Sequence, residues 1–278
     1  MFSIVIPTWN NLAHVKLCVE SIHKHTALPV QVILHINEGS DGTLEWAKQN
    51  NILFTHTAYN AGICIAVNMA ASLADRDFII YMNDDMYCCP GWDEGLASEI
   101  KEAGTDNFML SSTMIEPNDT QNPAVITADF GKDVEGFKEV ALLQALPGFH
   151  KNDWSGSSWP PCLIPRKYWN MVGGFSIEFS PGMTSDDDLA MKLWQTGCRY
   201  FKGTGKSFVY HFQTKSTGRI KKNDGRKQFL LKWGINSSTF NRYYLHKGQP
   251  FTGPLNVPNA SILRKDRLKA WYKKKFIY

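Results

Sequence analysis

The first hundred residues alternate between short apolar runs and stretches in which apolar residues recur at helical spacing. The runs predicted as strands are residues 3–7, 30–36, 52–55 and 78–82. The stretches predicted as helices are residues 12–24, 44–49 and 62–73. Strands that alternate with helices indicate βαβ units and a mostly parallel sheet, so the pattern predicts an α/β fold.

The alternation fades after about residue 104. Residues 116–161 are rich in Pro, Gly, Asn and Asp, and we expect a long irregular stretch there. Loops of that length are usually functional or disordered. Order is expected to return at 162–165, with a helix over 189–197, a strand over 207–212 near His211, and helices from about 225, interrupted by a loop at 248–258.

Two adjacent carboxylates, Asp84 and Asp85, follow the apolar run 78–82. Burying carboxylates at a strand end is costly unless a cation lies beside them. In open α/β sheets ligands bind just beyond the carboxyl ends of strands, and hard oxygen ligands suit Mg²⁺ or Mn²⁺. The alternative is an ordinary turn, because Asn83 and Asp84 are common turn residues.

A second acidic cluster, Asp186-Asp187-Asp188, follows Ser185 and precedes an amphipathic helix. Ser185 would serve as the N-cap, and acids in the first turn complement the helix dipole. Three consecutive acids exceed what capping requires. One of them is therefore a candidate general base toward a sugar hydroxyl.

Three single residues have both structural and functional interpretations. His211 ends an apolar strand; it is either a structural histidine or a ligand for an ion such as Mn²⁺. Trp9 follows the first strand and is either a core residue or a stacking surface for a base. Glu38 is either a plain loop acid or an acceptor for a base N–H.

Composition fits a globular protein, with 278 residues, 43% hydrophobic and 20% charged. No stretch reaches the roughly 18 apolar residues of a membrane span, and we expect no secretory signal because the sequence starts directly on a predicted strand. The six cysteines form no C-x-x-C pair, which is typical of reduced thiols. We therefore expect a cytoplasmic protein.

The net charge of +4 is unevenly distributed. Residues 213–232 and residues 261–278 each carry seven Lys/Arg and a single Asp, which leaves the rest of the chain acidic. Basic segments on an acidic body suggest anionic partners. Residues 215–227 would close over an anionic ligand, or form a solvated loop. Residues 261–278 would lie on an anionic membrane surface on the inner face of the membrane, or pack their aromatic side chains on the domain.

Two nucleotide-binding motifs are absent. Gly203-Thr204-Gly205-Lys206-Ser207 resembles the end of a P-loop, but Tyr200 stands where that motif requires Gly. No G-x-G-x-x-G follows the first strand, which argues against a dinucleotide enzyme.

An ordered series of short motifs resembles the inverting glycosyltransferases of family 2, which have the GT-A fold. The resemblance covers about residues 2–235. The motifs are IVIPTWN at 4–10, NEGSDGT at 37–43, NAG at 60–62 with Asn68, NDD at 83–85, PGW at 90–92, GGF at 173–175, DDDL at 186–189 and YH at 210–211.

The resemblance implies roles for individual residues. The residues implied for the nucleotide are Pro7, Thr8 and Trp9 in the nucleoside wall, Glu38 at the base edge, Asn60 in the same pocket and Asp84 at the ribose. Asp85 and His211 would ligate a divalent metal, Mn²⁺ or Mg²⁺, that binds the donor diphosphate. Asp186 would be the catalytic base, with Asp187 as its rival because Ser185-Asp186 replaces the usual Glu-Asp pair.

Two further departures concern the nucleotide side of the site. Asn37-Glu38 replaces the usual Asp-Asp or Asp-Asn, and Val67 stands where a basic residue often precedes the last Asn of its motif. The identity of the nucleobase in the donor therefore stays open at this point.

These observations predict a GT-A domain over residues 1–225 and a helical basic extension over 226–278. The domain would consist of a nucleotide-binding half, 1–103, and an acceptor-binding half, 104–225. It would use a nucleotide-sugar donor, most simply a UDP-sugar, and a saccharide or lipid-linked glycan acceptor, without nucleic acid. The alternatives are a sugar nucleotidyltransferase and a non-catalytic sugar- or nucleotide-binding protein. The former usually has a Gly-rich basic loop after the first strand, whereas the latter would not need all of Asp84, Asp85, Asp186 and His211.

Overall fold

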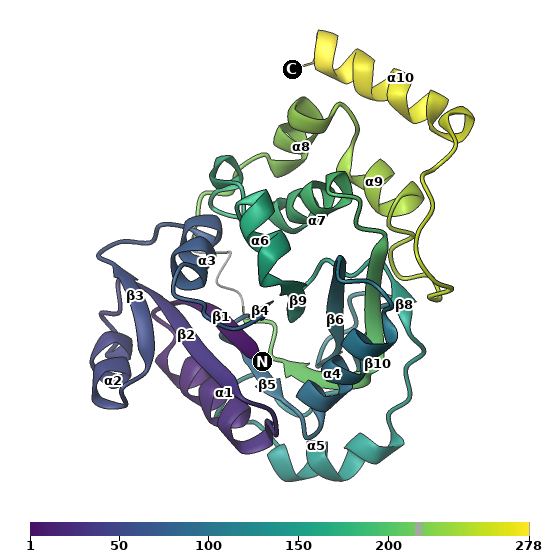
Figure 1. Ribbon diagram of the computed structural model, residues 1–278. Helices are drawn as coiled ribbons and strands as arrows, with labels where there is room; N and C mark the ends of the chain where they lie inside the picture. Colours follow the sequence, from purple (N-terminus) through teal and green to yellow (C-terminus); the bar gives the residue numbers. More distant parts are fainter. Residues whose placement is uncertain (215–217, 219, 278) are drawn as a thin grey trace.

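The computed structural model describes residues 1–214, 218 and 220–277. Helices and strands alternate through the first half of the chain, and helices dominate its last quarter (Figure 1). The strands are β1 (Phe2–Trp9), β2 (Val30–Asn37), β3 (Leu53–Thr57), β4 (Phe78–Tyr81), β5 (Met86–Cys88), β6 (Phe108–Glu116), β7 (Val125–Thr127), β8 (Trp154–Ser155), β9 (Cys162–Pro165) and β10 (Tyr200–His211). The helices are α1 (Leu12–His25), α2 (Thr43–Gln49), α3 (Ile63–Ala71), α4 (Trp92–Glu102), α5 (Glu139–Ala145), α6 (Arg166–Val172), α7 (Ser185–Gln195), α8 (Gly225–Trp233), α9 (Ser237–Tyr243) and α10 (Ala260–Phe276), with short 3₁₀ turns at Leu146–Gly148 and Ile177–Phe179.

One mixed sheet organises the described part of the chain, in the order β3-β2-β1-β4-β9-β6-β10-β5. Strands β3, β2, β1 and β4 are parallel neighbours, as the sequence pattern predicts. Strand β9 is antiparallel to both β4 and β6, so β6 and its parallel neighbour β10 run in the direction of β1. The carboxyl ends of β1, β2, β4, β6 and β10 therefore meet at one edge.

Helices cover both faces of the sheet because successive strand residues point to opposite sides. In β1, Val5 packs with α3, α6, α7, α8 and α9 on one face. Ile4 and Ile6 pack with α1, α2 and α4 on the other. The predicted α/β fold is confirmed, and each strand and helix predicted before residue 83 is present within a few residues of its predicted bounds.

The prediction of an irregular stretch after residue 116 is wrong in part, and β6 was missed. Strand β6 is buried at every position and pairs with β7, β9 and β10. Its polar segment, Ser111-Ser112-Thr113, hides the strand in the sequence. Each of the three hydroxyls is nevertheless hydrogen-bonded inside the fold, as buried hydroxyls need to be. The segment after β6 also contains β7, α5 and β8.

Two other boundaries differ from the prediction. Strand β10 begins at Tyr200 rather than 207, with an irregularity in its pairing between Thr204 and Phe208. A Cβ on Gly203 would lie 1.8 Å from the Trp154 ring, so this glycine of the P-loop-like segment allows close packing. Helix α7 begins at Ser185 rather than 189, and Thr184, not Ser185, occupies the N-cap position, with φ of 69°.

The C-terminal helices differ in how they contact the body. Phe229 of α8 and Phe240 of α9 are fully buried in the same core as Val5 and Phe201. In α10, by contrast, only Leu263 and Ala270 are buried. The domain boundary at residue 225 stays a prediction. Within the described residues, no helix combines the length and apolar character that crossing a bilayer requires.

Candidate functional site

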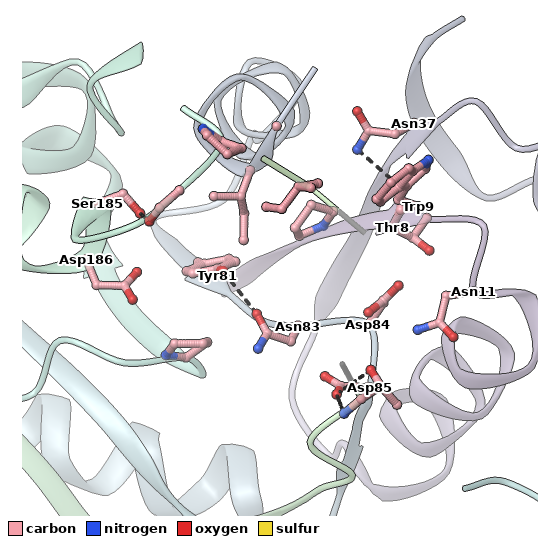
Figure 2. Close-up of a pocket in the computed structure, with 18 of the residues that line it drawn as sticks. Thr8, Trp9, Asn11, Asn37, Tyr81, Asn83, Asp84, Asp85, Ser185 and Asp186 are labelled. Atoms are coloured by element: carbon pink, nitrogen blue, oxygen red, sulfur yellow. Dashed lines mark hydrogen bonds between the residues drawn. The ribbon is translucent and has the colours of Figure 1, made fainter. Parts of the chain in front are cut away.

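A cavity of about 560 Å³ opens at the edge where the parallel strands end. Of the residues predicted for the site, Pro7, Thr8, Trp9, Asn60, Asp84, Asp85, Asp186 and His211 line it, whereas Glu38 and Asp187 do not. Figure 2 shows Thr8, Trp9 and Asn11 on one side of this space and Ser185 and Asp186 on the other. Asp84 and Asp85 lie nearer to Thr8 and Asn11 than to Asp186, a few residues after the end of β4.

The side chain of Asn37, at the end of β2, holds the nucleoside side of the cavity together. Its amide donates to the carbonyl of Thr8 at 3.3 Å, and its oxygen accepts the Ala61 N–H at 2.8 Å. These bonds connect β1, β2 and the loop before α3. Asn37 thus fixes the cavity wall in place. An Asp at this position could not donate a hydrogen bond to the carbonyl of Thr8.

Glu38 is turned toward a neighbouring loop. Its carboxylate accepts a hydrogen bond from the Asn10 side chain at 3.0 Å, and its own φ is 59°. The role of Glu38 at the edge of the nucleobase stays a prediction. It requires that a nucleobase reach the carboxylate of Glu38 despite its hydrogen bond with Asn10.

Left-handed backbone conformations gather beside the site residues. Asn10, Glu38, Thr184 and Gln213 all have positive φ although none is a glycine. They follow β1 and β2, precede α7 and follow β10, respectively. Such conformations cost about 1–3 kcal/mol each and persist where the surrounding structure over-determines them.

Asp85 and His211 meet at the base of the cavity. The Nε2 atom of His211 lies 3.5 Å from Asp85 Oδ1, and the other oxygen of Asp85 accepts two 2.8 Å bonds from Thr214. Burial disfavours the Asp85 carboxylate, but His211 and Thr214 outweigh it and lower the pKa of Asp85. Burial and the nearby Asp85 raise the pKa of Asp84. The pKa values of these two neighbouring carboxylates are thus shifted in opposite directions.

Glu116, at the end of β6, contacts His211 at Nδ1, the ring nitrogen on the side away from Asp85. Its Oε1 lies 2.8 Å from Nδ1 of His211, and Gln213 donates to its other oxygen at 2.8 Å. Burial disfavours the imidazolium, but Asp85 and Glu116 outweigh burial and raise the pKa of His211. A carboxylate on Nδ1 orients the ring so that Nε2 faces Asp85, which is the arrangement that metal-binding histidines commonly have.

These residues fit a divalent ion that is shared with a ligand. One carboxylate oxygen and one imidazole nitrogen are ligands that Mn²⁺ accepts, and their far atoms are already held by Thr214 and Glu116. An ion bound there would replace the proton on Nε2 of His211. No group of three or more His, Cys, Asp or Glu side chains in the described part of the chain is arranged to hold an ion alone. Ions that bind diphosphates commonly take only one or two protein ligands.

The three acids of α7 face three different surroundings. Asp186 lines the cavity. Asp187 accepts a 3.1 Å hydrogen bond from Asn241 and lies 3.7 Å from the ammonium of Lys247. Asp188 is fully buried and accepts the indole N–H of Trp233 at 2.8 Å. Consecutive helix residues point in different directions, and of the three acids only Asp186 lines the cavity.

Burial raises the pKa of Asp186 to about 7, with Asp187 acting in the same direction and the cation of Lys247 opposing it. A general base works best when its pKa is close to the working pH. Lys247 itself is nearly buried, and its ammonium donates to Ser158 at 2.7 Å and lies 3.6 Å above the Trp159 ring. It thus joins the cavity wall at Trp159 to the start of α7.

Comparison with known proteins places the chain in a family. The family model described as "Glycosyl transferase family 2" matches residues 3–157, which is more than half of the chain. The chain belongs to glycosyltransferase family 2. The curated glycosyltransferase GlyG of Streptococcus pneumoniae is 24% identical over 197 residues, covering 69% of this chain and 64% of GlyG. The chain thus spans less than two thirds of that relative.

Solved structures of S. aureus TarS share the fold. The complex of TarS with UDP-GlcNAc covers 83% of this chain and 64% of that chain, with a TM-score of 0.57 and 15% identity. The complex with UDP covers 75% of this chain and 59% of that chain, with a TM-score of 0.56 and 16% identity. At such identities the likeness concerns the fold alone, and it confirms the GT-A architecture of this family 2 chain.

Three side chains of the site escaped the sequence analysis: Asn37 in its structural role, Glu116 and Lys247. Glu116 ends the buried strand β6, as Asp84 follows a buried strand, so the same argument would have found it had β6 been recognised. Lys247 comes from a loop that the sequence places far from any family 2 motif. No local signal identifies it.

If Asp186 is the base that the sequence predicts, the rate of sugar transfer should rise with pH around pH 7, because its carboxyl must lose a proton before it can accept one. Replacing the nearby cation by Lys247→Met should move this limb to higher pH, since Lys247 lowers the pKa of Asp186. The measurement is the pH profile of kcat/KM for the acceptor. Lys247→Arg keeps the charge and is the matched control. A limb that stays in place in Lys247→Met would contradict the electrostatic role.

Proposed function

We propose that this chain transfers a sugar from a nucleoside diphosphate donor to a hydroxyl of a saccharide or lipid-linked glycan, with inversion at the anomeric carbon. The observation that carries this proposal is the position of Asp186, which lies across a single cavity from the strand-end pair Asp84-Asp85. Membership of family 2 supports the reaction class. A UDP-sugar is the favoured donor, because TarS structures contain UDP and UDP-GlcNAc.

Inversion follows from a single displacement. The acceptor oxygen forms a bond to the anomeric carbon while the bond to the diphosphate breaks on the opposite side, and Asp186 takes the hydroxyl proton. Holding acceptor, donor and base in one cavity supplies much of the acceleration that such a reaction needs. The cavity wall also includes Trp159 and Pro160, and Lys247 lies between the Trp159 ring and Asp187 at the start of α7. We assign this side of the cavity to the acceptor.

On the other side of the cavity, Pro7, Thr8 and Trp9 would bind the nucleoside and Asp84 the ribose. Asp85 and His211 would hold Mn²⁺ or Mg²⁺, which offsets the negative charge that develops on the departing diphosphate. The basic stretch 215–227 would close over the diphosphate; residues 215–217 and 219 of it lie outside the described residues. An acceptor attached to a lipid would be met at a membrane surface on the cytoplasmic side, and segment 261–278 is the part of the chain that we assign to that contact.

A thermal shift experiment tests the donor and the metal together. We expect UDP with Mn²⁺ to raise the melting temperature more than GDP, TDP or CMP, and more than UDP with a chelator. A ligand at 100 times its dissociation constant adds about 2.7 kcal/mol to the unfolding free energy, which is well within detection. An equal response to all four nucleotides would overturn the UDP assignment.

The products separate the proposal from its nearest alternative. A transferase releases UDP from a UDP-sugar and an acceptor, whereas a sugar nucleotidyltransferase releases pyrophosphate from UTP and a sugar phosphate. Detection of pyrophosphate release would favour the nucleotidyltransferase. Binding without any turnover of a panel of UDP-sugars and glycans would favour the non-catalytic alternative.

A further inference from the structure

Helix α10 is attached to the protein along one narrow face. Its two buried residues, Leu263 and Ala270, are seven positions apart and so lie on the same side of the helix. Asp266, between them, lies 3.4 Å from the hydroxyl of Thr239 in α9. Figure 1 shows α10 at the periphery of the molecule, beyond α8 and α9. The rest of its circumference is therefore presented away from the core.

The opposite side of α10 carries an apolar stripe. Leu268, Tyr272 and Phe276 follow one another at four-residue spacing, and they are 66%, 55% and 60% exposed. Trp271 lies beside them and is 54% exposed. The ring of Phe276 lies 5.0 Å from that of Tyr272 and 5.9 Å from that of Trp271, so these aromatic side chains contact one another. The sequence left open whether they pack on the domain; the structure shows that they do not.

The same helix is strongly basic. Seven Lys/Arg lie between residues 261 and 278, and its single acid, Asp266, faces α9. None of these seven cations forms an ion pair among the described residues, although Lys275 lies 5.2 Å from the Trp271 ring and 5.5 Å from that of Phe276. Lys265, Lys269 and Lys275 fall, by helical periodicity, on or beside the apolar stripe. A binding partner of α10 must therefore accept both apolar and cationic side chains.

An anionic bilayer surface satisfies both requirements. Aromatic and aliphatic side chains insert at the boundary between headgroups and acyl chains, while lysines extend to anionic headgroups. A second copy of α10 would bring the same positive charge against itself. A nucleic acid would pair with the lysines but leave Leu268 and Phe276 in water.

We propose that α10 docks this protein on an anionic membrane surface through the stripe Leu268-Tyr272-Phe276 and the lysines around it. Docking of this kind does not require the donor, the metal or the acceptor. It can therefore be tested apart from the transferase function, and failure of one leaves the other intact.

Sedimentation with liposomes is the test. The protein should sediment with phosphatidylcholine vesicles that contain about 30% phosphatidylglycerol, and not with pure phosphatidylcholine. Leu268→Ser with Phe276→Ser should lower the partition coefficient at least tenfold. Lys269→Glu with Lys275→Glu should do the same, because each basic residue at such a surface is worth about 1 kcal/mol, or roughly fivefold.

Matched controls use equally exposed residues elsewhere. Val140→Ser with Met171→Ser removes two apolar side chains that are 67% and 66% exposed on α5 and α6, and it should leave sedimentation unchanged. Lys48→Glu with Lys101→Glu is the corresponding charge control. All variants should keep the melting temperature of the unsubstituted protein, measured without ligand, which separates loss of docking from loss of folding.

Three outcomes would overturn the proposal. The protein does not sediment with anionic vesicles at low salt, or the control pairs lose sedimentation as strongly as the α10 pairs. In the third outcome, sedimentation velocity shows a dimer, Leu268→Ser with Phe276→Ser converts it to a monomer, and the protein does not bind vesicles. In that case the stripe is a contact between copies of the chain.

Discussion

Asp186→Asn should lower the rate of sugar transfer by about 10²–10⁴-fold while leaving donor affinity unchanged, because an amide cannot accept the hydroxyl proton. Asp186 is the one acid of the α7 cluster that lines the cavity. The measurements are kcat for transfer and, separately, the affinity for UDP with Mn²⁺ by calorimetry.

Asp187→Asn is the matched control for this experiment. Its carboxylate is engaged by Asn241 and Lys247, so the variant should keep measurable transfer even if the loop that carries Lys247 is loosened. An inactive Asp187 variant beside an active Asp186 variant would assign the base to Asp187 instead.

The Asp186→Asn substitution should also change stability in a pH-dependent way. Folding raises the pKa of Asp186 from 3.8 to about 7, so the wild type loses stability as pH rises through this window and the buried carboxyl ionises. The amide that replaces this carboxyl is never charged. The variant should therefore melt at a higher temperature than the wild type at about pH 8, and the difference should shrink toward about pH 4. Asp187 and Lys247 face the same carboxyl, so the size of the effect belongs to this group of three.

The nucleotide half of the fold was predictable because its physical signals are local. Strands buried on both faces give continuous apolar runs, and the helices between them show apolar residues at helical spacing. Asp84 and Asp85 stand out for a local reason too, since they follow such a run directly. The edge of a parallel sheet then brings them to Pro7, Thr8 and Trp9 without further information.

The second half depends on pairing that the sequence does not display. Strand β6 looks polar in its middle because Ser111, Ser112 and Thr113 carry hydroxyl groups. Their hydrogen-bond partners inside the fold belong to Ser157, Ser207 and Thr204. Those partners lie tens of residues away in the chain. Missing β6 also removed Glu116 from view, and with it the reason why His211 is oriented toward Asp85.

The choice among Asp186, Asp187 and Asp188 shows the same limit at the scale of one helix turn. Helical periodicity predicts that three consecutive acids point in three directions, but not which direction meets the cavity. That depends on Trp233, Asn241 and Lys247, which come from α8, α9 and the loop after α9. The part of the chain predicted as an extension thus supplies the side chains that engage two of the three acids.

Asp85→Ala should abolish the metal-dependent part of nucleotide binding. The substitution removes one of the two side chains assigned to the ion, and it leaves the N–H and hydroxyl of Thr214 without their acceptor. His211→Ala should weaken this binding.

Glu116→Gln, which keeps His211 but removes the carboxylate that contacts its Nδ1 atom, should lower metal affinity about 10–100-fold, as is typical of groups that orient a ligand. Calorimetry of UDP binding with Mn²⁺ and with a chelator measures all three variants. Unchanged Mn²⁺-dependent affinity in Asp85→Ala would remove Asp85 from the metal site, and an unchanged Glu116→Gln would show that Nε2 of His211 does not need its carboxylate neighbour to face the ion.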